Sequence, residues 1–176
     1  MNPINLFLIG YRCTGKTSVG RCLADTLGWS FIDTDDLIAN QQRMSIMEIV
    51  GAYGWENFRQ MEHDILKTVC DSTAQVVATG GGIVINEHNV KLMRENGSII
   101  WLRAEHETIK SRMLQDKTST EFRPALTMTD SLSEIEEILQ SREPIYRSAM
   151  DFYVDTDEHD VSTIAKIIAN KLDLKT

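Results

Sequence analysis

Residues 10–17 have the sequence Gly-Tyr-Arg-Cys-Thr-Gly-Lys-Thr, which fits the phosphate-binding loop pattern G-x-x-x-x-G-K-[S/T] at every fixed position. An apolar run of strand length at residues 4–9 precedes it, and apolar residues at helical spacing follow it over 18–27. Between a strand and a helix, the loop's N–H groups and the positive helix terminus face one concavity. We therefore predict a polyphosphate site, the alternative being a glycine-containing turn that binds nothing.

Side chains of this loop suggest what the nucleotide would contact. Lys16 is predicted to bridge the outer phosphates, and the Thr17 hydroxyl to be a direct ligand of a Mg²⁺ ion that keeps several waters. Cys13 could be a reactive thiol, because a helix N-terminus lowers a thiol pKa, but a small tolerated residue is the interpretation we favour. The predicted nucleotide-binding residues here are Gly10, Arg12, Cys13, Thr14, Gly15, Lys16, Thr17 and Ser18.

Length and composition restrict the class of protein. A chain of 176 residues is long enough for one domain, and we expect a single domain over residues 1–176. The formal net charge of -8 would repel the phosphate backbone of a nucleic acid, so we expect no nucleic-acid partner. No apolar run approaches the ~20 residues that cross a bilayer, so we expect a cytosolic protein without a membrane partner. Three cysteines without C-x-x-C spacing fit reduced thiols, and four scattered histidines argue against a zinc site.

Strand and helix patterns alternate along the whole chain. Strands are predicted at 4–9, 29–32, 75–79, 98–102 and 152–154, and helices at 18–27, 37–70, 86–96, 105–114, 131–142 and 161–172. Gly51 and Gly54 are expected to interrupt the long helical region, and Ser131 with Glu134 to form a capping box. The alternation predicts a three-layer α/β/α domain around a five-stranded parallel sheet.

A polar stretch at residues 115–126 has no hydrophobic period and contains Ser, Thr and Pro. Loops of this length within a compact domain are often lids, so we predict a mobile lid here. Arg123 lies inside it and could close over the transferring phosphate as an arginine finger.

Carboxylates gather at the end of the second predicted strand, where open α/β sheets bind ligands. Asp33 is predicted to hold a magnesium-bound water, and Asp35 to accept a proton from an acceptor hydroxyl. The alternative is that these aspartates only cap and stabilise the start of the next helix, a role that suits Asp36.

Three glycines and two arginines indicate an acceptor site. Gly80, Gly81 and Gly82 follow the third strand and allow close approach to a ligand, although a flexible turn is the alternative. Arg59 and Arg142 could together bind a carboxylate, which predicts an acid as acceptor, whereas either arginine alone would suit a surface ion pair. With the phosphate loop, these features predict phosphoryl transfer to a small acceptor.

The chain resembles the shikimate kinases over its whole length. The resemblance is carried by the phosphate loop, Phe-Ile-Asp-Thr-Asp from Phe31, Phe-Arg-x-x-Glu from Phe58, the glycine triplet, Arg123-Pro124, and Arg142-x-Pro-x-Tyr. It implies ATP-dependent phosphorylation of the 3-hydroxyl of shikimate on a nucleoside-monophosphate-kinase-like fold with strand order 2-3-1-4-5. It also implies that Asp35 holds the ring hydroxyls, that Arg59, Arg142 and the Gly81 backbone hold the substrate, and that Arg123 reaches ATP.

Two other functions stay open. A gluconate-type sugar-acid kinase would share the phosphate loop and the lid but differ in its acceptor site. In this chain we expect the acceptor site in the helical region 34–62. A non-catalytic nucleotide-responsive module would keep the fold without turnover. We expect a monomer whose partners are ATP, Mg²⁺ and shikimate.

Overall fold

The computed structural model describes residues 4–115 and 132–174. A five-stranded sheet lies at its centre, and every pair of neighbouring strands is parallel. The strand order is β2-β3-β1-β4-β5, which confirms the predicted fold class and strand order. The strands are β1 (Asn5–Ile9), β2 (Ser30–Asp33), β3 (Gln75–Ala78), β4 (Gly97–Arg103) and β5 (Phe152–Asp155).

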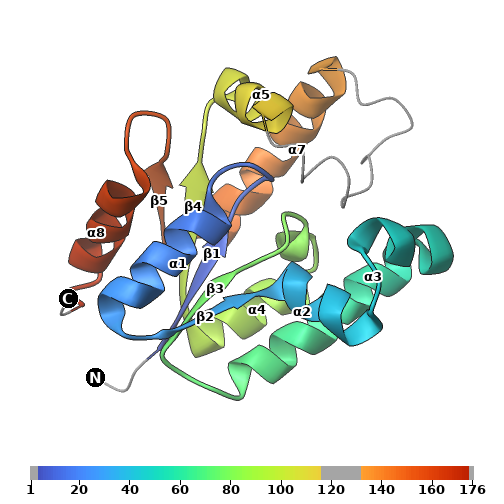
Figure 1. The fold of residues 1–176 in the computed structure, drawn as a ribbon, viewed down its shortest axis with the longest axis horizontal. Coiled ribbons are helices and arrows are strands. Elements are labelled where there is room, and N and C mark those ends of the chain that lie inside the picture. The colour runs from blue at the N-terminus through green and yellow to red at the C-terminus, as the bar shows by residue number, and fades with distance from the viewer. Residues whose placement is uncertain (1–3, 116–131, 175–176) are drawn as a thin grey trace.

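Helices cover both faces of this sheet (Figure 1). One face packs against α1 and α8, and the other against α3, α4, α7 and the short 3₁₀ helix η1. The helices are α1 (Lys16–Leu27), α2 (Thr34–Gln42), α3 (Ile46–Cys70), η1 (Ile83–Ile85), α4 (Glu87–Asn96), α5 (His106–Gln115), α7 (Leu132–Ala149) and α8 (Val161–Lys171). In the described ranges, none of these helices is long and apolar enough to cross a membrane.

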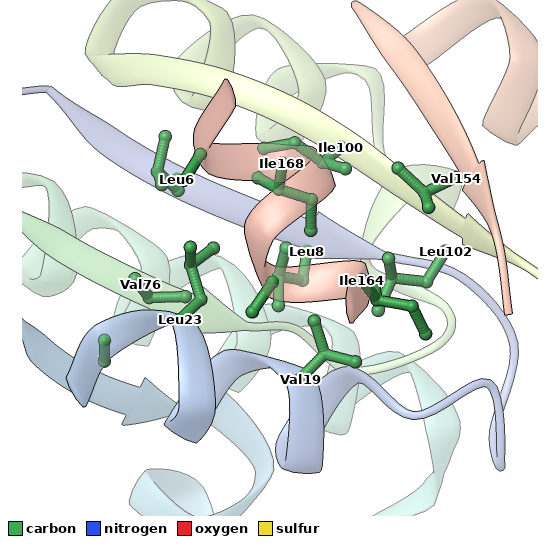
Figure 2. Close-up of a cluster of buried hydrophobic side chains, with 13 residues drawn as sticks. Leu6, Leu8, Val19, Leu23, Val76, Ile100, Leu102, Val154, Ile164 and Ile168 are labelled. Atoms are coloured by element: carbon green, nitrogen blue, oxygen red, sulfur yellow. The ribbon is translucent and has the colours of Figure 1, made fainter. Parts of the chain in front are cut away.

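The central strand β1 explains why two separate cores form. Leu6 and Leu8 point to the α1 and α8 side, into the cluster drawn in Figure 2, whereas Phe7 and Ile9 point to the opposite cluster. All four side chains are fully buried. A parallel strand covered on both faces is therefore apolar at nearly every position, as the sequence of β1 is.

The helical region after β2 is divided differently from the prediction. It breaks between α2 and α3, where Arg43 has a left-handed φ of 55° and Ser45 starts α3 through a reciprocal capping box with Glu48. Gly54, at φ 80°, interrupts α3 as expected, but Gly51 stays helical. The sequence signal for the break was the Ser-x-x-Glu pattern at residues 45–48, which was not recognised.

Helix α7 continues past the predicted end at Arg142 to Ala149, with Pro144 inside it. The prediction of its C-terminus was wrong because tertiary packing outweighs the local effect of proline: Tyr146 and Ala149 are buried against the sheet. The predicted cap at Ser131 lies outside the described residues, as does most of the predicted lid.

Candidate active site

Three functional segments meet at the carboxyl-terminal edge of the sheet. The phosphate loop follows β1, the aspartates follow β2, and the glycine triplet follows β3. Because these strands are adjacent in the order β2-β3-β1, segments far apart in the sequence become neighbours. This edge is the usual ligand-binding edge of an open α/β sheet.

The phosphate loop has the backbone that its glycines predict. Gly10 (φ 139°) and Gly15 (φ 93°) lie in the left-handed region, and a Cβ on Gly10 would collide with the Leu102 carbonyl. The buried Lys16 ammonium donates to the carbonyls of Gly10 at 2.8 Å and Tyr11 at 2.6 Å. These bonds hold the ammonium against the loop at the N-terminus of α1.

Thr17 and Asp33 lie side by side although they come from different elements. The Thr17 hydroxyl donates to Asp33 Oδ2 at 2.9 Å, while Asp33 Oδ1 accepts from the Asp35 backbone N–H at 3.1 Å as the N-cap of α2. Asp33 therefore fits the capping interpretation and the site interpretation together, and Asp36 lies in the first turn of α2 as expected. The oxygens of Thr17 and Asp33 are ligands of the kind that Mg²⁺ prefers.

A cavity opens next to the loop. Its wall contains all six residues predicted to bind the acceptor: Asp35, Arg59, Gly80, Gly81, Gly82 and Arg142. Tyr11 and Arg12 of the phosphate loop belong to the same wall. The loop and the acceptor residues thus share one cavity.

Aromatic rings support both arginines. The Arg59 guanidinium lies 5.2 Å from the Trp55 ring centroid and 5.5 Å from that of Phe58. The Arg142 guanidinium lies 5.8 Å from the ring centroid of the buried Tyr11. Two guanidinium groups on aromatic supports can bind a carboxylate in a fixed orientation.

Glu62 is a site residue that the sequence pattern did not single out for a role. Its side chain is 1% exposed, lines the cavity and forms an ion pair with Arg59. Burial raises its pKa from 4.5 to about 7, although the positive charge of Arg59 opposes that rise. The available signal was its spacing, three residues after Arg59 on one helix.

The glycine turn is fixed by hydrogen bonds from three other elements. The Gly80 N–H donates to the Thr34 hydroxyl at 3.0 Å, and the Tyr146 hydroxyl donates to the Gly81 carbonyl at 2.5 Å. Asn89 donates to the Ile83 carbonyl at 3.1 Å, just after the turn.

Burial raises the pKa of Tyr146 to about 12, which keeps its hydroxyl a donor. Sequence reasoning missed these supports, although Tyr146 lies one helical turn after Arg142.

Arg112 connects the phosphate loop to the loop after β5. Its guanidinium donates to the Cys13 carbonyl at 3.3 Å and to the hydroxyl and carbonyl of Thr156 at 3.0 and 2.7 Å. The sequence did not distinguish Arg112 from a surface arginine. The contacts show that α5 fixes the outer side of the loop.

The remaining predicted residues are placed as follows. Cys13 (φ 60°) and Thr14 lie within the loop, and Ser18 is exposed in the first turn of α1. Arg123 lies outside the described residues, so its position was not tested. Within residues 4–115 and 132–174, no cluster of three or more His, Cys, Asp or Glu side chains could hold a metal.

The fold and the site together define a P-loop kinase that acts on a small molecule. The sequence model of the family described as shikimate kinase matches residues 12–173. The chain belongs to the shikimate kinase family, which confirms the resemblance noted from its motifs.

Bacterial shikimate kinases are similar to this chain over most of its length. Shikimate kinase 2 of Photorhabdus laumondii is 42% identical over 83% of this chain and 82% of its own length. The shikimate kinase of Moorella thermoacetica is 39% identical over 97% and 95%. The structure of the Acinetobacter baumannii shikimate kinase in complex with shikimate superposes with a TM-score of 0.88 at 29% identity, covering 99% of this chain and 96% of that one.

Proposed function

We infer that the chain transfers the terminal phosphoryl group of ATP to the 3-hydroxyl of shikimate, giving shikimate 3-phosphate and ADP. The observation that carries this inference is that Asp35, Arg59 and Arg142 line one cavity with the phosphate loop. Shikimate offers hydroxyls for a carboxylate base and an acid group for two guanidinium groups. Family membership supports the same acceptor.

The proposed chemistry divides between the two sides of the cavity. Asp35 accepts the proton of the acceptor hydroxyl. The hydroxyl oxygen bonds to the terminal phosphorus of ATP, and the bond from that phosphorus to the leaving oxygen of ADP breaks. Lys16 and the loop N–H groups neutralise charge on the phosphates. Arg59, Arg142 and the glycine turn hold the acceptor in line for transfer.

Mg²⁺ is part of the proposal, because the hydroxyl of Thr17 and the carboxylate of Asp33 form a hard oxygen pair at the loop. Thr17 would bind the ion directly and Asp33 through a water. The ion would supply charge neutralisation between the outer phosphates. Too few acidic groups gather in the described ranges for a protein-only metal site, which fits an ion held mainly by phosphate and water.

The lid role of Arg123, the single-domain organisation, the monomeric state and the cytosolic location stay predictions. For Arg123, the family resemblance supports a contact with ATP from residues 115–126. The acceptor-binding region at 34–62 is supported by Asp35, Arg59 and Glu62, which line the cavity.

An acceptor panel tests the function. ADP release is measured with shikimate, the methyl ester of shikimate, gluconate and nucleoside monophosphates. We expect saturable turnover with shikimate and a strongly raised KM for the ester, because esterification removes the charge that two arginines bind. Turnover only with gluconate or a nucleotide would replace this proposal, and ATP binding without transfer to any acceptor would support the non-catalytic alternative.

A further inference from the structure

Glu62 sits unusually for a carboxylate. Its side chain is 1% exposed, one oxygen pairs with Arg59, and the other, Oε1, has no hydrogen-bond partner within the described part of the chain. Oε1 lies 2.5 Å from the position that a Cβ of Gly80 would take, beside the cavity. A buried carboxylate oxygen without a donor is costly when charged and can readily carry a proton.

A second carboxylate lies close by. Asp35 Oδ1 is 2.7 Å from that same Cβ position, so the two carboxylates lie close together beside Gly80. The negative charge of Asp35 opposes the ionisation of Glu62. An additional negative charge beside the buried Glu62 carboxylate would therefore raise its pKa further.

Charged groups from several elements surround Glu62. Arg59 on its own helix, Asp35 at the start of α2 and Arg142 on α7 act on its charge. Arg12 of the phosphate loop lines the same cavity, and the Tyr146 hydroxyl donates to the Gly81 carbonyl. His63, the next residue along α3, is directed elsewhere, with its Nδ1 2.6 Å from Asn89 Oδ1. Arg59 is the only group of this set that forms an ion pair with Glu62 among the described residues.

We propose that binding of the acid acceptor is coupled to proton uptake by Glu62. The proposal rests on the proposed function, because it needs an acceptor whose carboxylate shares Arg59 with Glu62. The incoming anion adds a negative charge beside Asp35 and Glu62. It also interacts with Arg59, so Arg59 stabilises the ionised form of Glu62 less. A proton from solvent then bonds to Oε1, the carboxylate oxygen that has no hydrogen-bond partner among the described residues.

The coupling fixes how acceptor affinity depends on pH. Burial holds the pKa of Glu62 near 7 without acceptor, and the bound anion raises it further. Below that range Glu62 is protonated in both states, so affinity is independent of pH. As pH rises through the range, binding must draw a proton from solvent, and affinity falls until Glu62 is ionised in both states. A rise of about one pKa unit makes binding about tenfold weaker at pH ~9 than at pH ~6.

Calorimetry measures the proton directly. Shikimate is titrated into the protein at pH ~7.5 in two buffers with different ionisation enthalpies, and the difference in heat gives protons taken up per acceptor. We expect about half a proton for a one-unit pKa rise, falling toward zero at pH ~5. Glu62→Gln should remove both the uptake and the tenfold pH dependence. Glu56→Gln, which removes an exposed charge from the same helix, should leave both unchanged.

Each outcome decides between this proposal and the function on which it rests. Binding and turnover of shikimate without proton uptake would overturn the role of Glu62 and leave the kinase function intact. Uptake that persists in Glu62→Gln would assign the proton to another group and also overturn it. Uptake in the wild-type protein stays informative even if Glu62→Gln does not fold. Absence of both binding and turnover would remove the proposed function and, with it, this coupling.

Discussion

At the scale of single residues, Asp33 and Asp35 have different neighbours although they are two positions apart. Asp33 is engaged by the Thr17 hydroxyl and caps α2, so it connects the nucleotide side to a helix. Asp35 lines the cavity beside Glu62. Their substitution should therefore have separable effects on metal binding and on proton transfer.

Asp35→Asn is expected to lower kcat by ~10² or more while ATP affinity stays nearly unchanged, because general-base contributions are of that order. Turnover with saturating shikimate and nucleotide titrations measure the two effects. Asp36→Asn is the matched control, since Asp36 is an exposed residue in the same turn. Wild-type turnover in Asp35→Asn would remove Asp35 from the chemistry.

Glu62 should also make stability depend on pH in the protein without ligand. Its pKa is about 7 when folded and 4.5 when unfolded, so its stabilising contribution is complete below about pH 4.5 and is lost as pH rises through 7. The loss is on the order of 3 kcal/mol. Unfolding midpoints of wild type and Glu62→Gln, compared from pH ~5 to ~8, should show this loss only in the wild type. Parallel curves would contradict the assignment.

A side chain at Gly80 is expected to disturb the cavity. A Cβ there would lie 2.5 Å from Glu62 Oε1 and 2.7 Å from Asp35 Oδ1, so Gly80→Ala must displace both carboxylates. We expect the KM for shikimate to rise about tenfold or more, as one misplaced site can cost this much. Gly51→Ala is the control: its added methyl meets no atom within 4 Å, and helix stability should gain about 0.5–1 kcal/mol. An unchanged KM in Gly80→Ala would show that the cavity can rearrange.

At the scale of elements, α7 and the glycine turn behave as one unit. Arg142 faces the cavity from α7, and Tyr146, one turn later, donates to the Gly81 carbonyl. Tyr146 also stacks on Trp101 of β4 at a centroid distance of 5.7 Å. The orientation of Arg142 therefore depends on a helix that is fixed to both the sheet and the turn.

Tyr146→Phe removes the hydrogen bond but keeps the ring packing. Loss of a part-buried hydrogen bond costs about 0.5–1.5 kcal/mol, so we expect lower stability and a raised shikimate KM with a smaller change in kcat. Chemical unfolding and steady-state kinetics measure both. Tyr153→Phe alters an exposed tyrosine on β5 and should change neither. Equal behaviour of the two variants would contradict the link.

The same scale explains which parts of the site were predictable. The P-loop, the aspartates and the glycine triplet could be located because each follows a recognisable strand. Glu62, Tyr146 and Thr34 were missed because their roles arise from contacts between elements, such as the Gly80 N–H meeting the Thr34 hydroxyl across 46 residues. The end of α7 was wrong because burial of Tyr146 and Ala149 outweighs Pro144, a balance that local sequence does not reveal.

At the scale of the whole molecule, the two faces of the sheet serve different purposes. The face under α1 and α8 is a closed apolar core, drawn in Figure 2, whereas the opposite face carries the helices that bring Arg59 and Arg142 to the cavity. The alternation of strands and helices along the chain predicted helices on both faces of the sheet, but not which face carries the cavity. Stability and acceptor recognition should therefore respond to different mutations.

Ile168→Ala tests this separation. Ile168 is fully buried between α8 and the sheet, and its truncation should cost about 2–5 kcal/mol in the free energy of unfolding. We expect the KM for shikimate to stay at the wild-type value at a temperature where the variant is folded. Lys166→Ala, at an exposed position on the same helix, should change stability by less than about 0.5 kcal/mol. A raised KM in Ile168→Ala would show that the two faces are coupled.

The central place of β1 has a consequence during synthesis. Both strands that flank it, β3 and β4, come much later in the chain, so β1 has no sheet partner until Gln75–Arg103 has been translated. The curled backbone after β1 relies on that sheet, since Gly10 abuts the Leu102 carbonyl. A nascent chain that stops before β3 would contain the whole phosphate loop but not the strands that flank β1. ATP affinity should therefore appear only once β4 has left the ribosome.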